Sequence, residues 1–121
     1  MRVFAEVGRK GGGGARPHAG WLAGQALQLL DAGADRVLLQ GEGITEDVEH
    51  LEEDLLMSFA SRVPLGRTVF QAKETRAQVW FLTAFGPHTS MDVDVASAVP
   101  LELMRRGIRQ RGLVGLVATV D

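Results

Sequence analysis

The chain has 121 residues, which is the size of one domain or of part of one. Its 13 Lys and Arg residues against 15 Asp and Glu residues give a net charge of -2, which excludes the basic excess typical of general nucleic-acid binding. With 45% apolar residues, 23% charged residues and no cysteine, the composition indicates a globular protein without disulfides or thiolate metal sites, and we expect a cytoplasmic protein with no membrane span.

The hydrophobic pattern predicts strands that alternate with helices. Strands are expected at residues 3–7, 36–40, 68–72 and 90–93. Helices are expected at residues 21–30, 46–60, 77–84 and from Pro100 onward. Thr45 is the expected N-cap of the second helix, and Pro100 is expected to open the last one. Gly33 and Gly86 are expected to end the first and third helices.

This alternation predicts an α/β fold of about four parallel βα units, because near-continuous apolar strands separated by helices are typical of a parallel sheet. Two architectures fit the pattern. One is a complete small doubly wound, flavodoxin-like domain, which periodicity alone favours; the other is half of a (β/α)8 TIM barrel. Residues 113–120 are either the fifth strand that the first architecture needs or an apolar tail.

Polar side chains follow each predicted strand, at the end where parallel α/β folds carry their functional groups. The strand ends carry Glu6 with Lys10, Gln40 with Glu42, Gln71 with Lys73, and Asp92 with Asp94. Such a row can bind a metal ion and a phosphorylated acid, although polar strand ends are also the ordinary expectation for a solvent-facing edge.

Glu6 and Lys10 are the most informative of these residues. Glu6 interrupts the apolar run VFAEVG, where a carboxylate needs a partner unless the alternation of the strand turns it to solvent. Lys10 follows in the next loop, and a lysine in a closed site can stabilise an enolate or deliver a proton. The run Gly11–Gly14 lacks the spacing of a phosphate-binding loop and predicts a flexible loop instead.

The remaining charged clusters each allow two interpretations. Asp92 and Asp94 share one side of a continuing strand and could hold Mg²⁺, or they form a loop pair that caps the last helix. The basic cluster near the chain end complements a helix C-terminus or binds an anion; it contains Arg105, Arg106, Arg109 and Arg111. The three histidines are not at ligand spacing, so a zinc site is not expected.

Four segments together resemble a known family. They are EVGRK at 6–10, LLDAGADRVLLQG at 29–41, TVFQAKETRAQVWFLTAFGP at 68–87 and VPLELMRRGIR at 99–109. In order and spacing they are similar to the C-terminal half of the phosphosulfolactate synthase family, over residues 3–109. The resemblance implies a partial TIM-barrel domain at residues 1–109, followed by an apolar tail at residues 110–121.

The resemblance also implies a chemistry. Members of the family add sulfite to phosphoenolpyruvate, with Mg²⁺ required, and an aci-carboxylate intermediate is then protonated. Lys10 matches the family's lysine after this strand and is the expected proton donor, while Glu6 has a catalytic, metal-binding or supporting role. We further expect Gln40 at the metal with Glu6. The residues expected at the substrate or its phosphate are Gln71, Arg105 and Arg109.

The chain departs from the family pattern at two carboxylates and in length. Gln40 and Gln71 stand where the family carries glutamate, and four βα units make about half a barrel. A half-barrel exposes strand edges, so we expect a homo-oligomer or pairing with a missing N-terminal half. Two hypotheses follow: a diverged lyase that acts on a phosphorylated acid, or a non-catalytic half-barrel remnant or interaction protein.

Overall fold

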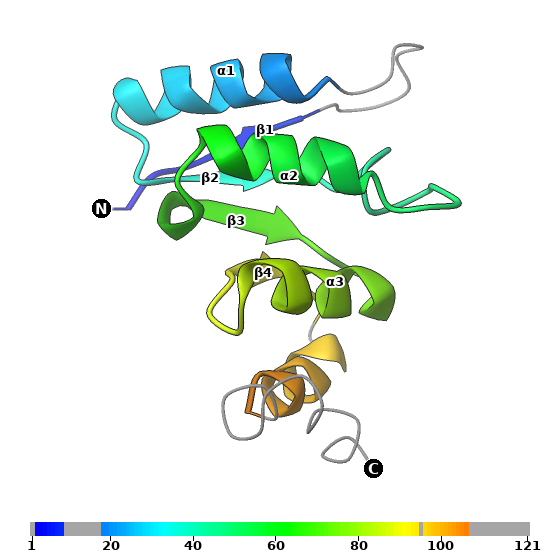
Figure 1. The fold of residues 1–121 in the computed structure, drawn as a ribbon. Coiled ribbons are helices and arrows are strands. Elements are labelled where there is room, and N and C mark those ends of the chain that lie inside the picture. Colours follow the sequence, from blue (N-terminus) through cyan, green and yellow to red (C-terminus); the bar gives the residue numbers. More distant parts are fainter. Residues whose placement is uncertain (1, 9–17, 95, 107–121) are drawn as a thin grey trace. The chain divides into compact units, whose positions relative to one another are not determined.

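The computed structural model describes residues 2–8, 18–94 and 96–106. Strands and helices alternate along it (Figure 1). The elements are β1 (Phe4–Val7), α1 (Ala19–Asp31), β2 (Arg36–Leu39), α2 (Glu53–Arg62), the short 3-10 helix η1 (Leu65–Arg67), β3 (Thr68–Gln71), α3 (Thr75–Phe85), β4 (Met91–Asp92) and a helix over residues 96–106. This order confirms the predicted α/β class of about four βα units, which is consistent with part of a barrel.

The chain divides into two compact units, Met1–Gln71 and Ala72–Asp121. The first unit contains β1, β2 and β3 with α1 and α2, and the second contains α3, β4 and the helix over residues 96–106. The expected boundary between a domain at residues 1–109 and a tail at residues 110–121 lies outside the described residues. No helix in the described part of the chain is long and apolar enough to cross a membrane.

The three strands of the first unit pair in parallel. Glu6 lies opposite Leu38, and Leu38 lies opposite Val69. Burial alternates along each strand, and the fully buried positions are Val7, Val37, Leu39, Thr68 and Phe70. Because side chains alternate between the two faces of a strand, Glu6, Leu38 and Val69 lie on the opposite face of the sheet from these residues.

The core of the first unit lies between the sheet and its two helices. Helix α1 contacts β1, β2 and α2, and it buries Leu22, Ala23 and Ala26. Helix α2 buries Phe59, whose ring meets that of Phe70 edge to face at 6.3 Å. Burying one such aromatic side chain contributes about 1.5–3 kcal/mol, so this contact fixes α2 against β3.

The second unit has a smaller apolar cluster. Leu82 of α3 packs with Leu101 and Met104 of the helix over residues 96–106. Helix α3 ends at Gly86, whose φ of 100° favours glycine, and Gly33 has a φ of 115° just after α1. Both glycines therefore end their helices as the sequence predicts.

Two predicted helix starts are wrong. Helix α2 begins at Glu53 after the N-cap Glu52, not after Thr45, because residues 41–46 close a tight loop on the carbonyl of Gly41. The last helix is already formed at residue 96, because the carbonyl of Asp94 accepts the N–H of Ser97 at 2.9 Å. Pro100 therefore falls in the second turn, where it removes one N–H donor.

Candidate functional site

Three predicted site residues meet at one edge of the sheet. Glu6 lies in β1, Gln40 directly follows β2, and Gln71 ends β3. Parallel pairing brings the carboxyl ends of the strands to the same edge, and the alternation of burial places these three side chains on the face opposite the helices. The structure thus brings together three members of the predicted row, while Lys10 lies outside the described residues.

Glu6 and Gln40 are joined directly. Gln40 Nε2 donates a hydrogen bond to Glu6 Oε2 at 3.1 Å, and the backbone N–H of Gln40 donates to the carbonyl of Val7 at 2.9 Å. The neighbouring Gly8 has a φ of 131°, and a Cβ there would lie 3.1 Å from Gln40 Cβ. Glycine at position 8 therefore leaves the space that the Gln40 side chain occupies.

Gln71 connects β3 to the loop that follows β2. Its Oε1 accepts the backbone N–H of Gly41 at 2.8 Å, and its carbonyl accepts the hydroxyl of Thr45 at 3.1 Å. A Cβ on Gly41 would lie 2.6 Å from Thr45 Oγ1 and 3.2 Å from the Gln71 carbonyl oxygen. The contact is therefore close enough to require glycine.

The loop after β2 is built by its own backbone. The carbonyl of Gly41 accepts N–H groups from Ile44, Thr45 and Glu46 at 2.8–3.0 Å, and Gly43 donates back to the carbonyl of Glu46 at 3.0 Å. Ile44 and Thr45 are 2% and 1% exposed. A loop held in this way presents a fixed backbone beside the strand ends.

The described strand ends, as they stand, do not fit a divalent metal ion. Mg²⁺ takes oxygen ligands in near-octahedral geometry. Gln40 turns its amide nitrogen toward Glu6, and Gln71 has already committed its oxygen to Gly41. Within residues 2–8, 18–94 and 96–106, no three Asp, Glu or His side chains gather in a ligand-like group.

The other predicted site residues are placed elsewhere or not described. Lys10 and Arg109 lie outside the described residues. In the second unit, the Arg105 guanidinium donates to the carbonyl of Pro87 and, at 2.7 Å, to that of Thr89. Arg105 therefore fastens the loop between α3 and β4, and its predicted contact with a phosphate stays a prediction.

The aspartate pair and the histidines contribute no metal site to the described part. Asp92 and Asp94 are exposed, and the carbonyl of Asp94 caps the start of the last helix. His18 instead serves as the N-cap of α1, because its Nδ1 accepts the N–H of Trp21 at 3.2 Å.

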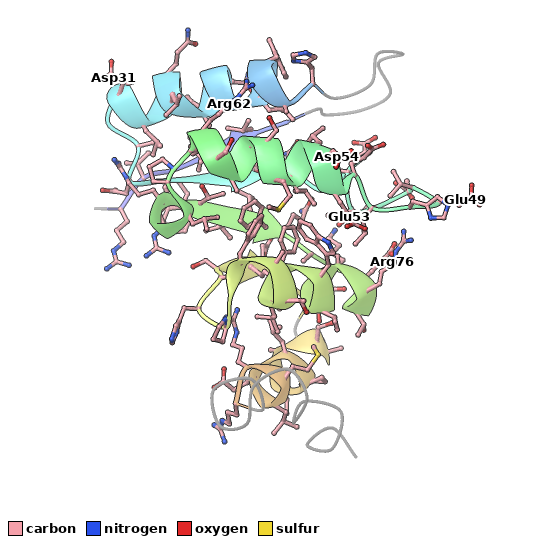
Figure 2. All side chains as sticks on the ribbon, in the orientation of Figure 1. Asp31, Glu49, Glu53, Asp54, Arg62 and Arg76 are labelled. Atoms are coloured by element: carbon pink, nitrogen blue, oxygen red, sulfur yellow. The ribbon has the colours of Figure 1, made fainter. Side chains whose placement is uncertain are left out.

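A groove of about 500 Å³ separates the start of α1 from α2. Figure 2 shows that Asp54 and Arg62, which both line it, lie at opposite ends of α2. Arg62 Nη1 lies 3.0 Å from the Cβ position of Gly20 on α1. The lining also contains Glu52, so it carries two carboxylates against one guanidinium and has no excess of positive charge for an anion.

Thr45 and Gly41 are the residues of this site that the sequence interpretation missed. A threonine followed by acidic residues is a strong helix N-cap signal. Thr45 was therefore predicted as an N-cap, whereas its hydroxyl bonds to the carbonyl of Gln71. The two glycines at positions 41 and 43 were the available signal, since glycines just after a strand commonly mark a close backbone approach.

A sequence model of the family described as (2R)-phospho-3-sulfolactate synthase (ComA) matches residues 1–111. The chain is 30% identical over 87 residues to a phosphosulfolactate synthase of Methanocaldococcus jannaschii, with 66% of this chain and 35% of that protein covered. A phosphosulfolactate synthase of Methanothermobacter thermautotrophicus is 29% identical over 87 residues, with 66% and 34% covered. Protein HEAT-STRESS-ASSOCIATED 32 of Arabidopsis thaliana is 26% identical over 81 residues, with 67% and 28% covered. The aligned part therefore spans about a third of these relatives.

Proposed function

Because the chain belongs to the (2R)-phospho-3-sulfolactate synthase (ComA) family, as its sequence segments predicted, we propose that it takes part in the addition of sulfite to phosphoenolpyruvate. The observation that carries this proposal is the family match over residues 1–111, which includes the row of strand ends with Glu6 and Lys10. Two of the relatives are named phosphosulfolactate synthase.

In the proposed reaction, the sulfur of sulfite bonds to the methylene carbon of phosphoenolpyruvate. The electron pair of the double bond moves toward the carboxylate, and the carbon that bears the phosphate then takes a proton. Lys10 is the proposed proton donor, because an ammonium group can both stabilise the developing negative charge and release a proton. Gln71, Arg105 and Arg109 are proposed to contact the substrate or its phosphate.

The catalytic form is proposed to need more than the described residues. The aligned part spans about a third of the relatives, so other βα units would supply further strand ends. We propose that a second copy or a partner carrying the remaining units supplies them. Light scattering tests this: we expect a mass of at least twice 13.1 kDa, whereas a monodisperse 13.1 kDa species with a cooperative melt contradicts it.

The reaction itself is tested directly. The chain is incubated with phosphoenolpyruvate, sulfite and Mg²⁺, and phosphosulfolactate is followed by ³¹P NMR. We expect product, and we expect Lys10→Ala to lower its rate by about 10²-fold or more, the size typical of a lost acid–base catalyst. Arg2→Ala removes a positive charge ahead of β1 and is the matched control. A parallel sample with EDTA tests the Mg²⁺ requirement that the family resemblance implies.

The second candidate is a non-catalytic member of the family. The hydrogen bonds of Gln40 to Glu6 and of Gln71 to Gly41 favour it, because they use the strand-end amides for structure. Absence of product from a folded sample of the chain overturns the catalytic proposal for the chain alone and favours this second candidate.

A further inference from the structure

We propose that Gln40 takes the place of a divalent cation at the carboxyl ends of β1 and β2. Its amide N–H, rather than a metal ion, holds the Glu6 carboxylate, and the strand ends bind Mg²⁺ only when residue 40 is itself a carboxylate. This inference concerns cation binding and folding, so it stands or falls independently of whether the chain is catalytically active.

The hydrogen bond between Gln40 and Glu6 runs from the amide nitrogen to the carboxylate. An ionised carboxylate only accepts hydrogen bonds, so the amide must present its nitrogen to Glu6 Oε2, at 3.1 Å. The amide hydrogens carry partial positive charge and point along the direction from which a cation would approach that oxygen. The hydrogen bond therefore offsets part of the negative charge of the Glu6 carboxylate.

Contacts with Val7 and Gly8 hold Gln40 in place. Its backbone N–H is bonded to the carbonyl of Val7, and its side chain lies over Gly8, whose Cβ position is 3.1 Å from Gln40 Cβ and 3.5 Å from Gln40 Oε1. Rotating the amide to offer its oxygen to a metal would forfeit the hydrogen bond to Glu6. The neutral amide oxygen would bring no negative charge to offset that loss, whereas a carboxylate at position 40 would.

The neighbouring amide, that of Gln71, offers no substitute ligand. Gln71 Oε1 accepts the N–H of Gly41 at 2.8 Å, and Gly41 is buried. Withdrawing this oxygen would leave a buried N–H without an acceptor, which is costly. Both amides at the described strand ends are thus already used internally. The Glu46 carboxyl carbon lies 3.2 Å from the Cβ position of Gly41, in the loop after β2.

The test compares Mg²⁺ responses among five proteins, which are the wild type and four variants. Glu6→Gln alone removes the carboxylate. Gln40→Glu places two carboxylates side by side. Glu6→Gln combined with Gln40→Glu exchanges the pair and keeps one carboxylate, so it has the same charge as the wild type. Gln28→Glu adds a charge at an exposed position of α1 and controls for net charge. Melting temperatures are measured in EDTA and in millimolar MgCl₂, and Mg²⁺ is titrated by calorimetry.

We expect no Mg²⁺-dependent shift for the wild type, the exchanged pair and Gln28→Glu. Gln40→Glu is expected to melt on the order of 5 °C lower in EDTA, because like charges repel at this distance, and to regain that loss with measurable binding heat in MgCl₂. If Gln40→Glu does not fold in EDTA, circular dichroism should show that it folds when MgCl₂ is added.

Three results would overturn the proposal. The first is a melting temperature that rises with Mg²⁺ in the wild type but not in Glu6→Gln. The second is a melting temperature of Gln40→Glu in EDTA that equals that of the wild type. The third is a loss of stability or of folding of Gln40→Glu in EDTA that Mg²⁺ does not reverse. Because none of these readouts is enzymatic, failure of this proposal is distinguishable from failure of the proposed function.

Discussion

The two ends of the β1–β3 sheet are both fastened by side chains, but in different ways. At the amino end, the Arg67 guanidinium donates to the carbonyls of Ala34 and Asp35 at 2.7 and 3.0 Å, and the Asp35 carboxylate accepts the N–H of Val3 at 2.6 Å. At the carboxyl end, the side-chain amides of Gln40 and Gln71 make hydrogen bonds. The bond of Gln40 joins it to another side chain, that of Glu6.

The two ends therefore differ in the groups that their side chains contact. The charged groups of the amino end bond to main-chain atoms of residues just before β1 and β2. The carboxyl end instead faces Glu6 and Gln40 toward each other beside a fixed loop, which is the arrangement that α/β folds use to hold ligands. Substitutions at the two ends should therefore differ in size and in consequence.

The largest expected effect is at Gly41. Gly41→Ala places a Cβ 2.6 Å from Thr45 Oγ1 and 3.2 Å from a backbone oxygen, so it should lower the free energy of unfolding by about 2–3 kcal/mol. Urea denaturation measures the loss. Gly24→Ala is the control, because no atom lies within 4 Å of that Cβ position on α1, and it should stabilise the protein by about 0.5–1 kcal/mol. Equal effects at the two glycines would contradict the close contact.

A smaller loss is expected at Gln71. Gln71→Ala leaves the buried N–H of Gly41 without its acceptor and should cost about 1–2 kcal/mol in the free energy of unfolding. Gln71→Glu keeps an acceptor oxygen at the same place and should remain within about 0.5 kcal/mol of the wild type. If both variants lose the same stability in denaturant titrations, the hydrogen bond to Gly41 is not what Gln71 contributes.

The smallest effect is expected at the amino end. Arg67→Ala removes two donors to carbonyls, but the side chain is exposed and water replaces part of what is lost, so we expect about 1 kcal/mol. Arg67→Lys keeps the charge without the forked donors and should recover less than half of the loss. Full recovery by lysine in thermal melts would show that charge alone matters there.

Much of the fold follows from the sequence because its signals are local. Alternating apolar runs place all four strands, and glycines with positive φ end α1 and α3 where expected. The meeting of Glu6, Gln40 and Gln71 also follows, since parallel strands bring their carboxyl ends together.

What the sequence did not reveal depends on contacts between distant residues. Thr45 satisfies the local rule for an N-cap, but its hydroxyl bonds to Gln71, 26 positions away, and the helix starts later. Arg105 looks like part of an anion-binding cluster, but its guanidinium reaches the carbonyls of Pro87 and Thr89. Neither partner is indicated by spacing along the chain, because both depend on how the loops pack.

The position at which phosphoenolpyruvate binds tests the assigned functional site most directly. We would titrate it into ¹⁵N-labelled protein and follow the backbone amide signals. We expect shifts at Glu6, Gln40 and Gly41, at the carboxyl end of the sheet, and none at Asp35 and Arg67, at its amino end. Shifts at the amino end with an unchanged carboxyl end would contradict the assignment of the functional site.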